Sequence, residues 1–239
     1  MTMVLFEIGA EVFETLPTLC VGLVYAEGFD NGRPSEVADR ALDEAIEGAE
    51  ERLTGMKASE DPRVQPYRAA FHALGMSPSR YPSSNIALLR RVAKGKGVGR
   101  INALVDLGNA VSIAHGLPLG VHVMGSPTSL LELRMSRAGD VFVPLGAAEA
   151  DPTLAPGELV YAEGDLVQTR RWTWRQSENG KTGPDATSAL IPIDGFTDSN
   201  LDAVLAARDE LAHLIEEAFG CRVATGLASA DSPRVELAC

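Results

Sequence analysis

We expect an α+β fold, and three observations on the sequence predict it. Apolar residues recur at helical spacing through much of the first half of the 239-residue chain. From about residue 118 the pattern changes to short β-branched runs separated by turn residues. One more helical pattern follows near the end. Such a grouping of helices, strands and a closing helix indicates α+β packing, here in a single domain over residues 1–239.

The first third of the chain reads as two strands followed by helices. The runs "MVLFEI" and "TLCVGLVYA" are short, apolar and closed by turn residues, as strands are. An amphipathic helix is expected over residues 35–53, with Asp and Glu on its outer face. Two shorter helices are expected near 66–74 and over "PSSNIALLRRVAKG", which begins with a Ser N-cap and ends at Gly95.

A polar stripe distinguishes the next helix, residues 101–114. Asn102, Asp106 and Asn109 fall at i, i+4 and i+7, so they share one side of an otherwise apolar helix. One interpretation is a buried hydrogen-bond network that ties the helix to neighbouring loops. The other is a pocket wall that offers amide and carboxylate groups. Spacing alone leaves both open.

Strands dominate the second half of the chain. They are expected at "LGVHVMG", "LELRMS", "DVFVPLG", "GELVYAEG", "LVQTRRWTWRQ" and "ALIPIDG". A final helix is expected over 199–219 and stops at Gly220. After it, "CRVATGLASADSPRVELAC" is expected to form one strand and a loose tail, with the tail assigned to residues 222–239.

Both tryptophans of the chain lie in "RRWTWRQ", residues 170–176. If this segment is a strand, Arg170, Trp172, Trp174 and Gln176 share one face, and Arg171, Thr173 and Arg175 share the other. The aromatic face fits a core strand with arginines in solvent. It equally fits a site wall, in which an aromatic platform meets a base or a side chain and arginines meet phosphate or carboxylate.

Charge and composition exclude several classes of protein. With 21 Lys and Arg against 33 Asp and Glu, the net charge of −12 argues against a general nucleic-acid binder, and we expect no DNA partner. No apolar run is long enough to span a membrane, and the N-terminus reaches Glu7 without a basic region, so we expect no signal peptide. Three cysteines and four histidines show no metal-ligand spacing. We therefore expect no metal, no membrane partner and a reducing, cytoplasmic location.

One stretch departs from the acidic average. Between Arg80 and Arg100 no Asp or Glu occurs, and six cations do: Arg80, Arg90, Arg91, Lys94, Lys96 and Arg100. They fit a solvated helix end, where the helix dipole favours cations. They also fit a basic face for RNA.

Known catalytic motifs are missing. "GKGVGR" (95–100) lacks the full phosphate-loop pattern and follows a helix where such a loop follows a strand. There is no GxSxG elbow and no catalytic cysteine signature. We therefore expect no cofactor and no covalent intermediate.

The order of several segments resembles one family. "YPSSNIALLRRVAKGKGVGRINALVDLGNAVSIAHGLPLG" precedes "RAGDVFVPLG", "PGELVYAEGDLVQTRRWTWRQ" and "IPIDG". Together, over about residues 62–196, they are similar to the B3/B4 domain of the phenylalanyl-tRNA synthetase beta subunit in its free-standing form. In the synthetase this domain is the editing module, which hydrolyses tyrosine mistakenly attached to phenylalanine tRNA. The resemblance implies helices and sheet around a cleft, and deacylation of an aminoacyl-tRNA in trans.

The resemblance also implies site residues. "LPLGVHV" matches the segment that carries an editing histidine, but here the aligned position is Gly120, and His122 lies two residues later. Because i and i+2 face the same way in a strand, His122 is the candidate catalytic base. "WRQSE" matches the segment whose glutamate recognises the tyrosine hydroxyl. A neutral Gln176 there implies a different amino acid.

The remaining candidates follow from the same match. The substrate-binding candidates are Asn102, Asp106, Asn109, Trp174, Gln176, Glu178, Asp194 and Gly195. The candidates for binding the tRNA acceptor end are Arg80, Arg90, Arg91, Lys94, Lys96, Arg100 and Arg175. An aminoacyl ester is already activated, so a positioned water can hydrolyse it, with a histidine base as a help.

Three functions remain open from the sequence. The first is a trans-acting deacylase that edits a mischarged aminoacyl-tRNA. The second is a non-catalytic module that binds tRNA, a free amino acid or a related small molecule, which the negative net charge and the displaced histidine favour. The third is hydrolysis of some other ester or amide in the same cleft. The sequence leaves the amino acid, the tRNA and the oligomeric state open.

Overall fold

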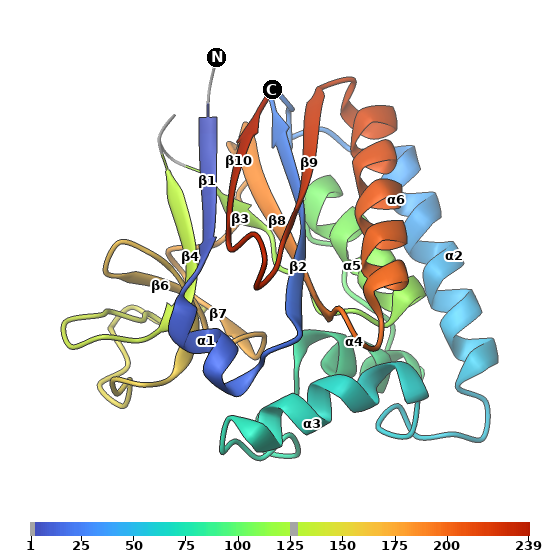
Figure 1. The fold of residues 1–239 in the computed structure, drawn as a ribbon. Coiled ribbons are helices and arrows are strands. Elements are labelled where there is room, and N and C mark those ends of the chain that lie inside the picture. Colours follow the sequence, from blue (N-terminus) through green and yellow to red (C-terminus); the bar gives the residue numbers. More distant parts are fainter. Residues whose placement is uncertain (1–2, 125–128) are drawn as a thin grey trace.

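The computed structural model describes residues 3–124 and 129–239 and has the predicted α+β architecture (Figure 1). The helices are α1 (Ala10–Thr15), α2 (Glu36–Arg52), the 3-10 turn η1 (Pro62–Val64), α3 (Gln65–Ala73), α4 (Ser84–Val92), α5 (Ala103–His115) and α6 (Leu201–Phe219). The strands are β1 (Met3–Ile8), β2 (Leu19–Glu27), β3 (His122–Val123), β4 (Leu130–Met135), β5 (Leu159–Glu163), β6 (Leu166–Arg170), β7 (Arg175–Gln176), β8 (Ser188–Phe196), β9 (Arg222–Ala228) and β10 (Arg234–Ala238).

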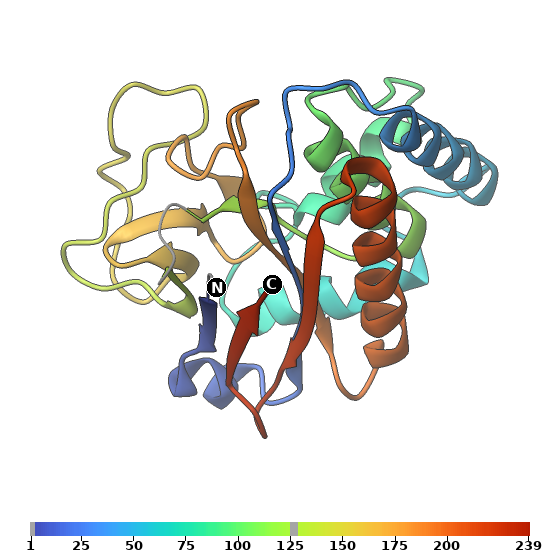
Figure 2. The same cartoon turned by 90° about the horizontal axis from the view of Figure 1, so that it is seen from above.

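The strands form two sheets. The six-stranded sheet has the order β10-β1-β4-β5-β6-β7, with β1 and β4 parallel and the other neighbours antiparallel. The four-stranded sheet has the order β3-β8-β2-β9 and is antiparallel throughout. Both views show the two sheets side by side, with α2, α5 and α6 beyond the four-stranded sheet (Figures 1 and 2).

The core lies on both faces of the four-stranded sheet. Almost every residue of β2 and β8 is buried, because one face meets the helices and the other meets the six-stranded sheet. Helix α6 approaches this sheet closely at two glycines. A Cβ at Gly22 would lie 2.9 Å from Val204 Cγ1, and a Cβ at Gly195 would fall directly on Val204 Cγ2. These glycines therefore allow the helix to approach the backbone of the sheet.

The predicted helices are confirmed, and their ends follow local rules. Ser35 caps α2, since its hydroxyl accepts from the backbone N–H of Ala38. Gly116 and Gly220 end α5 and α6 with φ of 71° and 62°, in the left-handed conformation that glycine adopts without strain. None of the helices among the described residues combines the length and the apolarity needed to cross a membrane.

Two expected strands differ in the structure. "DVFVPLG" (140–146) is a loop with isolated bridges at Val141 and Pro144. The strand expected at "LGVHVMG" shortens to His122–Val123, and its last residue, Gly125, lies outside the described residues. A run of β-branched residues forms a strand only where it can pair with a neighbouring strand. In the folded protein these two segments find only short or isolated pairing.

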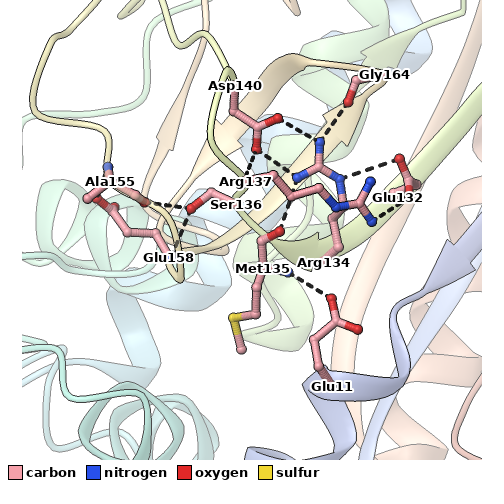
Figure 3. Close-up of polar contacts among 10 residues, drawn as sticks. All are labelled: Glu11, Glu132, Arg134, Met135, Ser136, Arg137, Asp140, Ala155, Glu158 and Gly164. Carbon is pink, nitrogen blue, oxygen red and sulfur yellow. Dashed lines mark hydrogen bonds and ion pairs between the residues drawn. The ribbon is translucent and has the colours of Figure 1, made fainter.

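The long connection between β4 and β5 is a loop rather than a strand, and hydrogen bonds from two buried arginines fix its conformation. The guanidinium of Arg134 donates to both carboxylate oxygens of Asp140, at 2.7 and 3.0 Å, and to the carbonyl oxygen of Gly164 at 2.6 Å (Figure 3). Arg170 donates to Glu158 at 2.6 and 2.9 Å and to Asp151 at 2.8 Å. Each guanidinium is almost fully buried, and its partners replace the water it has lost.

The segment 222–239, for which one strand and a loose tail were expected, is folded into two strands, so the expectation of a loose tail is wrong. β9 pairs with β2, and β10 pairs with β1 at the opposite end of the chain, with Val4 opposite Leu237. Leu237 is buried in the core. Most residues of the two strands are half-buried or exposed, so their pattern is weak without the partner strands that stabilise them.

Candidate functional site

Two connected cavities lie where both sheets meet α4 and α5. The inner pocket, about 90 Å³, is lined by Ser84, Leu119, Gly120, His122, Tyr161, Thr169, Trp172, Thr173, Trp174, Arg175, Gln176 and Asp194. The outer groove, about 450 Å³, is lined by Ser84, Ala87, Leu88, Arg91, Val98, Gly99, Ile101, Val105, Asn109, Leu119, Gly120, Val121, Trp174 and Gln176. Several residues line both, so the groove leads into the pocket.

The segment "RRWTWRQ" forms most of one wall, and the expectation of a continuous strand there is wrong. β6 ends at Arg170 and β7 begins at Arg175, so residues 171–174 make the turn between them. Arg171 and Trp172 have φ of 51° and 60°, a left-handed conformation that is uncommon outside glycine. Trp172 is nevertheless fully buried, and its backbone N–H donates to the carbonyl oxygen of Leu159 at 2.6 Å. The burial offsets the strain and turns Thr173 and Trp174 toward the cavities.

A hydrogen-bonded carboxyl forms the floor of the inner pocket. Asp194 Oδ1 accepts from the Tyr161 hydroxyl at 2.6 Å and from the Trp172 indole N–H at 2.7 Å. Burial raises the pKa of Asp194 to about 7, which the two hydrogen bonds only partly oppose. Burial likewise raises the pKa of Tyr161 well above its ordinary value, so its hydroxyl keeps its proton. The next residue along β8, Gly195, packs on α6 and does not face the pocket.

His122 lies on the edge strand β3, where it pairs with Leu190 of β8. Its ring centroid is 5.4 Å from that of Tyr161. Burial lowers the pKa of His122 to about 4, so the ring is neutral at neutral pH and can accept a proton. A Cβ at Gly120 would lie 3.0 Å from His122 Nε2, so this nitrogen lies beside Gly120, a residue that lines both cavities.

Three polar atoms on the pocket residues have no hydrogen-bond partner within the part of the chain that the structure describes. They are His122 Nδ1, Thr173 Oγ1 and Ser84 Oγ. A buried polar atom without a partner costs about 1–3 kcal/mol, so such atoms are rare and each needs an explanation. Their grouping around one cavity indicates that a ligand or water completes them. The sequence did not single out Ser84, Tyr161 or Thr173, because they belong to separate segments.

The other candidates from "WRQSE" separate in space. Gln176 lines both cavities, and its Nε2 donates to the carbonyl oxygens of Val121 at 3.0 Å and Gly180 at 2.6 Å. Glu178 lines neither. Its carboxylate accepts from the N–H of Gly146 at 2.7 Å, and this bond lowers its pKa. Glu178 therefore holds a loop, and the side chain that faces the cavities is the neutral amide.

The polar stripe of α5 serves two purposes. Asn102 is the N-cap: its Oδ1 accepts from the N–H of Val105, and its Nδ2 donates to Thr182. Asp106 accepts from the N–H of Ile101, and burial raises its pKa. Neither residue lines a cavity, whereas Asn109 lines the outer groove. Asn102 and Asp106 therefore belong to a hydrogen-bond network that ties the helix to its neighbours, and Asn109 belongs to a cavity wall.

The basic candidates also divide by position. Arg91 lines the outer groove and Arg175 lines the inner pocket, with its guanidinium 5.9 Å from the ring centroid of Trp174. Arg100 forms ion pairs with Asp39 and Asp43 of α2. The other candidates line neither cavity: Arg90 and Lys94 lie in a separate depression, Arg80 lies over the Tyr81 ring, and Lys96 is exposed.

A larger cavity of about 620 Å³ lies elsewhere, at the start of α6. Its basic residues are already paired, Arg63 with Asp61 and His115 with Glu210, and its other charged residues are Asp198 and Asp202. Among residues 3–124 and 129–239, no group of His, Cys, Asp and Glu is arranged to hold a metal ion. The unpaired polar atoms therefore favour the smaller inner pocket as the site.

Comparison with known proteins gives a family and a distant structure. The family model described as the B3/4 domain matches residues 66–220, which is more than half of the chain. Among solved structures, the chain is similar to an N-terminal fragment of the phenylalanyl-tRNA synthetase beta-subunit from Pyrococcus horikoshii, with 11% identity and a TM-score of 0.44. The match covers 92% of this chain and 50% of that one, so this chain spans about half the length of that structure. A search of the curated proteins finds no match.

Proposed function

The chain belongs to the B3/4 domain family, and on that premise we propose that it is a trans-acting editing protein that hydrolyses the ester of a mischarged aminoacyl-tRNA. The observation that carries the proposal is the paired cavity. A small pocket that includes several polar side chains opens into a larger groove, as a site for an aminoacyl group joined to a nucleotide requires.

The walls favour one orientation of the substrate. The outer groove combines apolar side chains, the Trp174 ring and the guanidinium of Arg91. An adenine can stack on an aromatic ring, and a phosphate binds arginine. The terminal adenosine of the tRNA therefore belongs in the outer groove and the aminoacyl group in the inner pocket. Arg175 is exposed beside Trp174, which lines both cavities, and we expect its guanidinium to reach out of the pocket to the phosphate next to the same adenosine.

This orientation puts the ester beside Gly120 and His122 Nε2, where the two cavities join. A water held there can attack the carbonyl carbon while the neutral imidazole takes its proton. General base catalysis of this kind contributes roughly 10²–10⁴-fold to a rate. The absence of a side chain at Gly120 leaves room for the water.

The test is a deacylation panel. Purified protein is incubated with tRNAs that carry different mismatched amino acids, and release of the amino acid is measured. We expect release from at least one of them, a loss of about 10²-fold or more with His122→Ala, and an altered preference among amino acids with Gln176→Ala. Thr225→Val, an exposed position on β9, is the control. No release from any member of a full panel contradicts the proposal.

Binding of tRNA is tested separately. Arg91→Glu and Arg175→Glu should each weaken binding and reduce its dependence on salt by about one ion, because each removes a phosphate contact. Arg234→Glu, on β10 and away from both cavities, is the matched control. Equal loss in all three variants argues against a role for the groove.

A second function has one observation in its favour. Burial lowers the pKa of His122, and no carboxylate in the described part of the chain raises it, so the ring is a weak base. A non-catalytic module that binds tRNA or a small amino-acid-like ligand in the same cavities fits this. Binding of uncharged tRNA or of a free amino acid, with no release from the panel, is its expected result.

A further inference from the structure

We propose that the aminoacyl group accepted by this site carries a short hydroxylated side chain, that of serine or threonine. This inference rests on the proposed function for the identity of the ester. Its own support comes from the size, the rigidity and the unpaired atoms of the inner pocket.

The size of the inner pocket favours a small side chain over an aromatic one. Its volume is about 90 Å³, which is smaller than the cavity of about 150 Å³ known to hold benzene. A serine or threonine side chain has two or three heavy atoms, fewer than the six carbons of a phenyl ring, and so suits a pocket of this size better.

The deep end of the pocket is built to resist expansion. Tyr161 and Trp172 are almost fully buried, and both are fixed by hydrogen bonds to the same oxygen of Asp194. The Trp172 ring also stacks on Phe71 at 5.8 Å and meets Phe196 edge-on at 6.0 Å. Moving the indole to admit a ring would break these contacts and the strained turn that presents it.

The unpaired atoms select for a hydroxyl over a methyl group. His122 Nδ1, Thr173 Oγ1 and Ser84 Oγ come from β3, the β6–β7 turn and the start of α4, and all three residues line the pocket. A substrate hydroxyl can both donate and accept, so it can satisfy two of these atoms at once. A methyl group would leave them buried without partners. Sites that bond a substrate hydroxyl reject the analogue that lacks it more strongly than apolar pockets reject a methylene.

The first test compares rates with the wild-type protein. The kcat/KM for deacylation is measured with tRNAs carrying serine, threonine, alanine, valine and phenylalanine. We expect serine or threonine to be released at least about tenfold faster than alanine and valine, and phenylalanine to be slowest. Release of phenylalanine at the rate of serine would overturn the inference and leave the proposed function standing.

The second test assigns the selection to Thr173. The variant Thr173→Val keeps the shape of the side chain and removes its hydroxyl, whereas Thr173→Ser keeps the hydroxyl. We expect the serine-to-alanine ratio of kcat/KM to fall about tenfold in Thr173→Val and to be retained in Thr173→Ser. The same Val substitution at the exposed Thr225 should leave the ratio unchanged. An unchanged ratio in Thr173→Val would refute the role of this hydroxyl.

A binding measurement separates the two possible failures. Adenosine analogues that carry serine, alanine or phenylalanine through a stable 3′-amide are titrated into the protein by calorimetry. If no charged tRNA is hydrolysed, the proposed function fails, but tighter binding of the serine analogue than of the other two still supports the inference. Equal or tighter binding of the phenylalanine analogue overturns it.

Discussion

Two titratable groups of the inner pocket, Asp194 and His122, should make stability depend on pH in opposite directions. Burial raises the pKa of Asp194 from its ordinary 3.8 to about 7. Between these values the unfolded chain has lost the proton and the folded protein keeps it, so stability falls as pH rises. Each pH unit across this window lowers the free energy of unfolding by about 1.4 kcal/mol, and the whole window lowers it by about 4 kcal/mol.

The burial of His122 makes stability rise with pH. Burial lowers its pKa from 6.5 to about 4, so between these values the unfolded chain binds the proton and the folded protein does not. Its contribution to stability is present above pH 6.5 and is lost as pH falls through the window, by about 3 kcal/mol in all. In the wild-type protein the two effects largely offset each other below pH 6.5.

Asp194→Asn isolates the effect of the carboxyl. The free energy of unfolding is measured by urea titration from pH 5 to pH 8 for both proteins, and the variant value is subtracted from the wild-type value. Over this range the difference should fall by about 3 kcal/mol. A constant loss from altered hydrogen bonding shifts the difference without changing its slope. A difference that is flat or rises with pH refutes the account of Asp194 as a carboxyl destabilised by burial.

The remaining predictions concern the same pocket and its scaffold. For His122→Asn, the free energy of unfolding of the wild type minus that of the variant should rise by about 2 kcal/mol from pH 5 to pH 6.5. A falling difference in the same urea titrations contradicts this prediction. Gly195→Ala should lower the free energy of unfolding by about 1–3 kcal/mol, because the added Cβ meets Val204. Gly48→Ala, on the open face of α2, should not destabilise the protein. Equal melting temperatures for the two variants would refute this. Arg170→Ala should cost about 3 kcal/mol of unfolding free energy, since it leaves two carboxylates without their buried partner, and Arg234→Ala, at an exposed ion pair, should cost under about 1 kcal/mol. Similar urea midpoints for the two arginine variants would count against this role of Arg170.

Local signals in the sequence were sufficient for much of the framework. Helical periodicity, the cap at Ser35 and the glycines at 116 and 220 are read within a few residues of where they act, and the helices they predict are present. The burial of Trp172 also follows from its size and apolar surface. The segments that resemble the B3/B4 domain lie in the region matched by the family model.

Other features depend on partners far away in the chain. The strand β10 exists because β1 offers it a ladder more than two hundred residues earlier, and the β6–β7 turn is fixed by what Trp172 meets in the core. For the same reason the expected alternation of faces along "RRWTWRQ" was wrong.

The sequence by itself determined the class of fold, most helices and the family to which the chain belongs. Only the tertiary structure decided which side chains meet at the inner pocket. Ser84, His122, Tyr161, Thr173 and Asp194 come from five segments, and nothing in their local patterns reveals that they share a cavity. Periodicity and caps report on neighbours within one or two turns of the chain. Whether a polar atom is buried without a partner depends on every element packed around it, so it becomes visible only when the chain is folded.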